Sequence, residues 1–435
     1  MKILKNYHIL PLFIILFLIY SSRLRGGEVL SLEELKNQAE RGNRNAQVAL
    51  GNSYYFGRHG GINYNLAFKW YSKAVESGSK AALFNLALCY ENGAGVKKNQ
   101  MKAFSLYKQA ADAGILQAEF NLALCYKHGL YNSSGTVEYL APNLLIAERK
   151  LKELSESNFP PSFRELAELY IEKGGEENYT KAYALLKKAA YYKDTAAMRL
   201  LADCYQNGWG CRKSDKDRVL WLEKATENGS IEALAKLGFC YEHGDSVVMN
   251  KEKAFSYFRK AASGGLAMAQ SKMGEYYANG IYVKQDILKA KEWYLKAAKQ
   301  NNPNAIFTLG LYALEGIGEE KSEKKAVVFF TQAAKLDEPH AQYNLGCFYM
   351  QGRGVLKDPA AAFFWFKRAA EQNDLKGERE LAFCYLRGTG TAQNYDKGMF
   401  WLKKAAADGD VKARNLLSEV GANPGSNGRG SRPGL

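Results

Sequence analysis

Small and apolar residues recur along the chain with a period of 36 positions. Residues 86–90 (LALCY) return as residues 122–126, 36 positions later (122 minus 86), and looser copies continue toward the C-terminus. The most regular column of this pattern is aromatic and gives ten units: Tyr54, Tyr90, Tyr126, Tyr170, Tyr205, Tyr241, Tyr277, Ala313, Tyr349 and Tyr385. A fixed period of this length predicts stacked copies of one supersecondary unit and argues against several separate globular domains.

Each unit predicts a first helix, which we call the A helix. Mostly Ala, then Leu or Met, then the Tyr position follow one another at intervals of four residues and therefore lie on one helical face. The residue after the Leu or Met is Gly or Ala in every unit, which predicts that a neighbouring helix backbone approaches closely there. Three residues after the Tyr position, nine units carry Gly, which ends helices readily, and Lys173 is the exception.

A second helix, the B helix, is predicted to begin nine residues after the Tyr position, where the regular units carry Asn, Ser or Asp. These residues are typical N-caps because their side-chain oxygen accepts a hydrogen bond from the first helical turn. In the two irregular units the expected caps are Asn143 and Asn178. Small and aromatic residues line one side of the B helix, and Gly, Asn or Asp, such as Gly78 and Asp194, marks its expected end.

One helix hairpin cannot bury both its Ala-rich and its aromatic-rich face, so successive hairpins must stack. We therefore predict an all-α fold, a right-handed α/α superhelical solenoid of about ten 36-residue helix-turn-helix repeats over residues 43–420. Within residues 28–42 an N-terminal capping helix is expected, because Ser31 and Glu34 have the spacing of a capping box. An eight-residue insertion near residues 130–137 predicts a surface loop, and residues 421–435 predict a flexible Gly-rich tail.

The N-terminal residues predict a targeting segment. An uncharged apolar run at residues 9–20 follows Lys2 and Lys5. A helix of roughly 12 residues reaches roughly 18 Å, short of a hydrocarbon core of about 30 Å, so the run fits a signal peptide. Residues 1–27 are expected to be a signal peptide or, alternatively, an N-terminal membrane anchor through residues 7–22. The chain is thus expected to be exported, as a secreted, periplasmic or secretory-pathway lumenal protein.

Composition excludes several classes of protein. Hydrophobic residues make up 47% of the 435 positions, too many for a disordered chain, and seven Cys are too few for a disulfide-dense miniprotein. The net charge of +15 favours solubility and attraction to anionic surfaces without naming a partner. Lysines recur on the B helix just before an Ala, as a solvated face, so no nucleic-acid partner is expected.

The repeat resembles the Sel-1-like repeat family, which is related to the tetratricopeptide repeat. The resemblance covers roughly residues 43–417, and residues 352–370, which run from Gly-x-Gly-Val to Trp-Phe-Lys-Arg-Ala-Ala, are among the closest stretches. Departures are Ala313, Arg218, Gly398, Lys173 and the insertion in the third unit. The resemblance implies a non-enzymatic adaptor for a protein or peptide partner, which is often exported in bacteria. Eukaryotic relatives imply the alternative of a membrane-anchored scaffold subunit in a secretory-pathway or envelope complex.

The cysteine and histidine residues do not indicate a catalytic site. Five cysteines directly precede the Tyr position, in a column otherwise filled largely with apolar residues, and are expected to be buried free thiols: Cys89, Cys125, Cys204, Cys240 and Cys384. Cys204 and Cys211 are the one pair placed to meet in a disulfide. A cysteine-rich branch of the family staples each hairpin, but the corresponding columns hold Ala here, as at Ala110 and Ala118. No catalytic set, metal site or cofactor motif is found, so no enzyme is expected.

The candidate partner-binding surface lies on the A helices, which usually line the concave side of a helical solenoid. The positions two before and two after the recurrent Leu or Met are apolar in units two, three, eight and nine, charged in units four and five, as at Arg164 and Glu168, and mixed in unit ten. The candidate residues are Phe84, Leu88, Phe120, Leu124, Phe307, Leu311, Tyr343 and Phe383. Such a row predicts a groove with aromatic anchors. The alternative is that these side chains pack between neighbouring repeats, because periodicity alone does not separate the two faces of an A helix.

Overall fold

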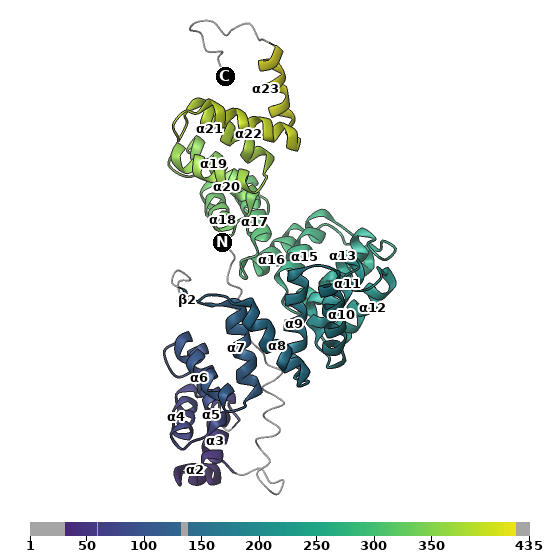
Figure 1. The fold of residues 1–435 in the computed structure, drawn as a ribbon. Coiled ribbons are helices and arrows are strands. Elements are labelled where there is room, and N and C mark those ends of the chain that lie inside the picture. Colours follow the sequence, from purple (N-terminus) through teal and green to yellow (C-terminus); the bar gives the residue numbers. More distant parts are fainter. Residues whose placement is uncertain (1–30, 59, 132–137, 423–435) are drawn as a thin grey trace. The chain divides into compact units, whose positions relative to one another are not determined.

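The computed structural model describes residues 31–58, 60–131 and 138–422 (Figure 1). These residues form 22 helices and one pair of short strands. The predicted targeting segment 1–27 and positions 423–435 of the predicted tail lie outside the described residues. Among the helices that are described, none is long and apolar enough to span a lipid bilayer.

The chain divides into two compact units, and the first is Met1–Lys213. Consecutive helices of this unit pack on one another as hairpins. Its helices are α2 (Leu32–Glu40), α3 (Arg44–Phe56), α4 (Tyr64–Glu76), α5 (Lys80–Asn92), α6 (Gln100–Asp112), α7 (Leu116–His128), α8 (Leu144–Glu156), α9 (Pro160–Lys173), α10 (Glu176–Tyr191) and α11 (Thr195–Asn207). The all-α repeat fold is confirmed, with odd numbers from α3 onward marking A helices and even numbers marking B helices.

The second unit is Ser214–Leu435 and repeats the same pairing of consecutive helices. Its helices are α12 (Asp215–Glu227), α13 (Ile231–His243), α14 (Lys251–Ser263), α15 (Ala267–Asn279), α16 (Ile287–Ala298), α17 (Pro303–Glu315), α18 (Glu323–Lys335), α19 (Pro339–Gln351), α20 (Pro359–Glu371), α21 (Leu375–Arg387), α22 (Tyr395–Asp408) and α23 (Val411–Ala422). Helix α23 occupies the A position after the last complete hairpin. It ends at Ala422 and so includes the first two residues of the predicted tail, 421 and 422.

The ends of the helices largely follow the predicted chemistry. The capping box at the start of α2 is formed, since Ser31 and Glu34 exchange hydrogen bonds with each other's backbone N–H. The side chains of nine predicted B-helix caps accept backbone hydrogen bonds: Asn63, Asn99, Asn143, Ser214, Asn250, Asp286, Ser322, Asp358 and Asn394. Each such cap typically stabilises its helix by about 1 kcal/mol. Local sequence therefore sets where most hairpins bend.

The fourth hairpin departs from this rule at both ends of its B helix. Asn178 was expected to cap α10, but the helix begins at Glu176 after Gly175, and the Asn178 amide donates a hydrogen bond back to the Gly174 carbonyl. Two successive glycines in the left-handed region turn the chain early, so no oxygen-bearing cap is needed. Asp194, expected to end α10, instead caps α11, and Lys193 takes the positive φ of 62°.

A glycine of the A helix admits an aromatic ring from the following B helix. A β-carbon added at Gly346 would lie 2.5 Å from the Phe366 ring, and one at Gly310 would lie 2.7 Å from Phe330. The prediction that small residues at this column admit a helix backbone is therefore wrong for these two positions. The column admits side chains because each buried ring projects from its B helix into the space above the glycine.

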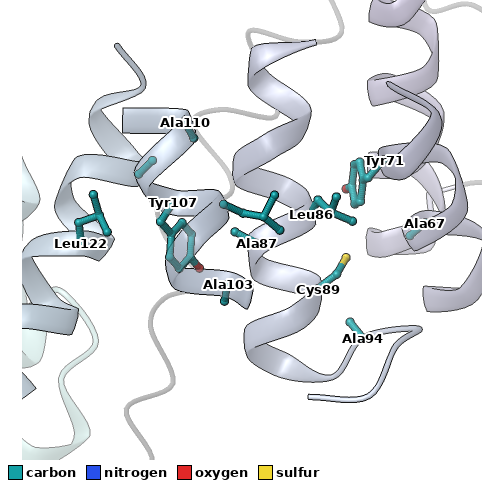
Figure 2. Close-up of a cluster of buried hydrophobic side chains, with 12 residues drawn as sticks. Ala67, Tyr71, Leu86, Ala87, Cys89, Ala94, Ala103, Tyr107, Ala110 and Leu122 are labelled. Atoms are coloured by element: carbon teal, nitrogen blue, oxygen red, sulfur yellow. The ribbon is translucent and has the colours of Figure 1, made fainter. Parts of the chain in front are cut away.

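The hydrophobic core is a series of layers shared by neighbouring hairpins. In the first and second hairpins, Tyr71 of α4 and Tyr107 of α6 lie on opposite sides of α5 (Figure 2). Between them α5 contributes Leu86, Ala87 and Cys89, all buried. Each layer is thus closed only by the next hairpin, as expected for a repeat protein.

The insertion after α7 forms a short antiparallel ladder at its described ends. Strand β1 (Leu130–Tyr131) pairs with β2 (Glu138–Leu140), and Leu130 is buried. Strand β1 also packs against α6. The insertion thus begins and ends as a strand pair, and positions 132–137 of the predicted loop lie outside the described residues.

Candidate functional site

Four of the predicted partner-binding residues form a row on three successive A helices of the second unit. Phe307 and Leu311 belong to α17, Tyr343 to α19 and Phe383 to α21. We call this set the aromatic row. All four side chains are half-buried, and the rings of Phe307 and Tyr343 rest on Phe330 and Phe366, with centroids 5.7 and 6.1 Å apart. Phe307 and Tyr343 are therefore packed on the core on one side and remain partly exposed on the other.

Cationic side chains lie over the rings of this row. The Lys376 Nζ is 5.7 Å from the centre of the Tyr343 ring, and the guanidinium carbon of Arg387 is 5.2 Å from that of Phe383. Within the described part of the chain, neither cation forms an ion pair with a carboxylate. Burial raises the pKa of the Tyr343 hydroxyl, which therefore remains a neutral hydrogen-bonding group. The row combines the predicted apolar surface with positive charge that the repeat pattern did not indicate.

The predicted residues of the first unit are more enclosed. Phe84 and Leu88 of α5 are half-buried against the core cluster, with the Phe84 ring 5.8 Å from that of Tyr107. Phe120 and Leu124 of α7 are buried, at 5% and 7% exposure. The interpretation of these two as surface contacts is wrong in this structure. Phe159 of the next repeat lies 5.7 Å from the Phe120 ring and covers it, so this pair packs between repeats.

The charged section of the predicted surface is occupied by its own ion pairs. Lys127 Nζ of α7 lies 2.8 Å from Glu165 and 3.1 Å from Glu168, both on α9. Arg164 binds the same two carboxylates and also Asp194, the N-cap of α11, at 3.1 Å. The side chains of Lys127 and Glu165 are only 5% and 10% exposed. Arg164 and Glu168 belong to the predicted charged section, whereas Lys127 was not predicted to join them, because partners 38 positions apart (165 minus 127) meet only after stacking.

No group of three or more His, Cys, Asp or Glu residues placed to hold a metal ion occurs in the described ranges. Helices with a repeating hydrophobic face and a partly exposed aromatic row are typical of proteins that bind other proteins.

Comparison with known families decides the assignment. The Sel1 repeat model matches ten segments, at residues 44–79, 80–115, 116–138, 164–191, 195–230, 231–266, 267–302, 303–338, 339–374 and 376–410. The chain belongs to the Sel1 repeat family. The segments follow the hairpins, with gaps at residues 139–163 after the insertion, at 192–194 after α10 and at 375. Sel1 repeat proteins are helical solenoids that generally act as protein-interaction scaffolds.

Solved structures of Sel1 repeat proteins resemble the chain. One is a protective antigen of uropathogenic Escherichia coli with an SLR fold, with 27% identity, a TM-score of 0.51 and coverage of 90% of this chain and 91% of that one. A Sel1 repeat protein from Oxalobacter formigenes has 22% identity, a TM-score of 0.48 and coverage of 94% and 93%. Cysteine-rich protein B of Helicobacter pylori has 26% identity and a TM-score of 0.26, and covers 31% of this chain and 97% of its own length. No curated protein matches the chain.

The five cysteines that directly precede the Tyr position are buried or half-buried thiols in the structure. Cys89, Cys204, Cys240 and Cys384 are buried, Cys125 is half-buried, and these five thiols form no disulfide. Burial raises the pKa of the thiols of Cys89, Cys125, Cys204 and Cys384 to about 12. These thiols are therefore packing groups and poor nucleophiles at neutral pH.

We expect the five column thiols to resist labelling by a disulfide reagent in the native chain at about pH 8 and to react at once in denaturant. The native thiols keep protons that the unfolded chain releases between about pH 9 and pH 12, so the free energy of unfolding should fall as pH rises through that window. Thiol counting in buffer and urea, with urea midpoints at about pH 8 and pH 10, checks both points. Rapid native labelling of these five cysteines would contradict their burial.

Proposed function

We propose that this Sel1 repeat protein is an exported, non-enzymatic adaptor that holds a protein or peptide partner on the aromatic row of its second unit. The observation that carries the proposal is the half-burial of Phe307, Leu311, Tyr343 and Phe383 on successive A helices. Because the rings of Phe307 and Tyr343 are held by the core on one side, they offer apolar contact area at little cost in side-chain entropy.

The charges beside the row favour a partner with carboxylate groups. Lys376 and Arg387 lie over two of its rings without a carboxylate partner in the described residues. A peptide whose apolar side chains alternate with Asp or Glu would satisfy both features. Export is supported by the apolar run at residues 9–20, and the similar protein of uropathogenic E. coli is described as a protective antigen.

Replacing Tyr343 and Phe383 together by Ala is expected to abolish capture of the partner, because aromatic anchors at an interface each contribute about 2 kcal/mol or more. Wild-type and variant chains, used as bait in extracts of the source organism, would be compared by quantitative mass spectrometry. The matched control replaces Phe364 and Phe400 by Ala, since these aromatic side chains are exposed on B helices of the same unit.

The partner is the protein that disappears with the row variant and persists with the control. Equal loss with both variants would indicate nonspecific hydrophobic capture. A large drop in melting temperature for the row variant, with a normal control, would show that the row is part of the core, and the proposal would fail.

A further inference from the structure

A second surface with binding chemistry lies at the end of α10 in the first unit. A hollow of about 360 Å³ is lined there by Asn158, Phe163, Lys187, Lys188, Tyr191 and Tyr192. Asn158 follows the end of α8, Phe163 lies in the first turn of α9, and the other four residues lie in the last turns of α10 or directly after it. Three consecutive helices thus contribute to one open site, which we call the tyrosine-lysine hollow.

Aromatic rings build the floor and rim of the hollow. Phe163 is 1% exposed and forms a rigid base. Tyr192 stacks on it at 6.0 Å with an interplanar angle of 28°, and Tyr191 meets Tyr192 edge-on at 5.4 Å. Tyr191 is nevertheless 83% exposed and Tyr192 49% exposed. The two tyrosines therefore present ring faces and hydroxyl groups to solvent from a supported position.

Positive charge accompanies these rings. Lys188 Nζ is 5.6 Å from the centre of the Phe163 ring, and Lys187 Nζ is 5.7 Å from that of Tyr183. Over residues 31–58, 60–131 and 138–422, neither ammonium group forms an ion pair with a carboxylate. The nearby Asp194 is bound by Arg164. Two cations beside exposed tyrosines are thus available to an anionic ligand.

The other repeats show that the fold does not require these residues. The position of Tyr191 is acidic in five other B helices: Glu76, Asp112, Glu156, Glu227 and Glu371. The position of Tyr192 holds no aromatic residue in any other repeat. The other B helices pack against their neighbours without aromatic residues at these two positions. Tyr191 and Tyr192 are therefore not required for repeat packing, which favours a role in binding.

We propose that the tyrosine-lysine hollow binds an acidic peptide segment, with carboxylates on Lys187 and Lys188 and an apolar or aromatic side chain against Tyr191 and Tyr192. Tyrosine supplies large, rigid and amphipathic contact area, which is typical of peptide-binding surfaces. Nucleic acid is a weaker fit, because the lining holds two lysines on one helix and lacks a track of cations that would follow a phosphate backbone. The hollow is a separate site from the aromatic row and does not depend on it.

The test is fluorescence polarisation of the full chain with a fluorescein-labelled peptide that carries several Glu around one Phe. Its twin carries Gln at every Glu position. We expect the Glu peptide to bind, the Gln peptide to bind about tenfold more weakly, and the double change Lys187→Glu and Lys188→Glu to weaken the Glu peptide about tenfold or more. The double change Tyr191→Ala and Tyr192→Ala should weaken both peptides.

The control replaces Lys69 and Lys108 by Glu, which makes the same change in net charge at exposed positions of the same unit. An equal loss in this control would assign the binding to net charge and overturn the proposal. Failure of the Glu peptide to bind, or complete competition by a short oligonucleotide but not by unlabelled Glu peptide, would do the same. The loss caused by Lys187→Glu and Lys188→Glu should stay about tenfold when Phe383→Ala is added to both the wild type and the lysine variant, which separates this site from the aromatic row.

Discussion

Replacing Gly346 by Ala is expected to lower the free energy of unfolding by about 1–3 kcal/mol, the usual cost of overpacking a core. Helix propensity alone predicts the opposite, since Ala is better than Gly inside a helix by about 1 kcal/mol. The steric term dominates because the new β-carbon would lie 2.5 Å from the buried Phe366 ring. Urea unfolding followed by circular dichroism measures the difference.

The last repeat supplies the matched rescue. Its corresponding positions hold Ala382 and Leu402, which are buried in one core cluster. Adding Phe366→Leu to Gly346→Ala copies that pair. The double variant should therefore lose about 1–2 kcal/mol less free energy of unfolding than the two single variants lose when their losses are summed. A neutral or stabilising Gly346→Ala variant, or single losses that simply add, would show that the ring moves aside at no cost.

Replacing Lys127 by Met is expected to cost about 3 kcal/mol of stability at neutral pH, because removing one partner of a buried ion pair leaves an uncompensated charge. Glu165 is 8% exposed and would keep Arg164 as its ion-pair partner. The matched control is Lys150→Met. Its pair with Glu119 at 3.4 Å is 20% and 28% exposed, so its loss should cost less than about 1 kcal/mol.

The effect of Lys127 should depend on pH. Burial by itself would raise the pKa of Glu165, but Arg164 and Lys127 outweigh it and hold that pKa below its usual range. A lowered carboxyl pKa stabilises the chain fully above the unfolded value of about 4.3, and this stabilisation is lost as pH falls through the folded pKa. The advantage of the wild type over Lys127→Met should therefore be complete near pH 7 and shrink below about pH 4. A gap of equal size at both pH values would mean that Lys127 stabilises by packing and not by charge.

Much of the repeat architecture could be read from single positions, because helix ends depend on local chemistry. The N-caps from Asn63 to Asn394 and the glycines after the A helices needed no knowledge of neighbours. Prediction failed at Asn178 and Asp194, where two glycines and a lysine with positive φ move the ends of α10. A backbone conformation of that kind has a weak sequence signal, since Lys rarely adopts it.

The sequence by itself determined the ten repeats, the family and the column from which a partner surface would come, because these depend on periodicity and local backbone preference. Only the tertiary structure decided which side chains of that column remain partly exposed to solvent. Phe120 and Phe307 hold equivalent positions, yet Phe159 covers the first, while the second remains half-buried. The pairing of Lys127 with Glu165 and the hollow at Tyr191 likewise depend on the tertiary structure. The physical reason is that exposure and charge pairing depend on how consecutive hairpins stack, and stacking joins residues that no period in the chain relates.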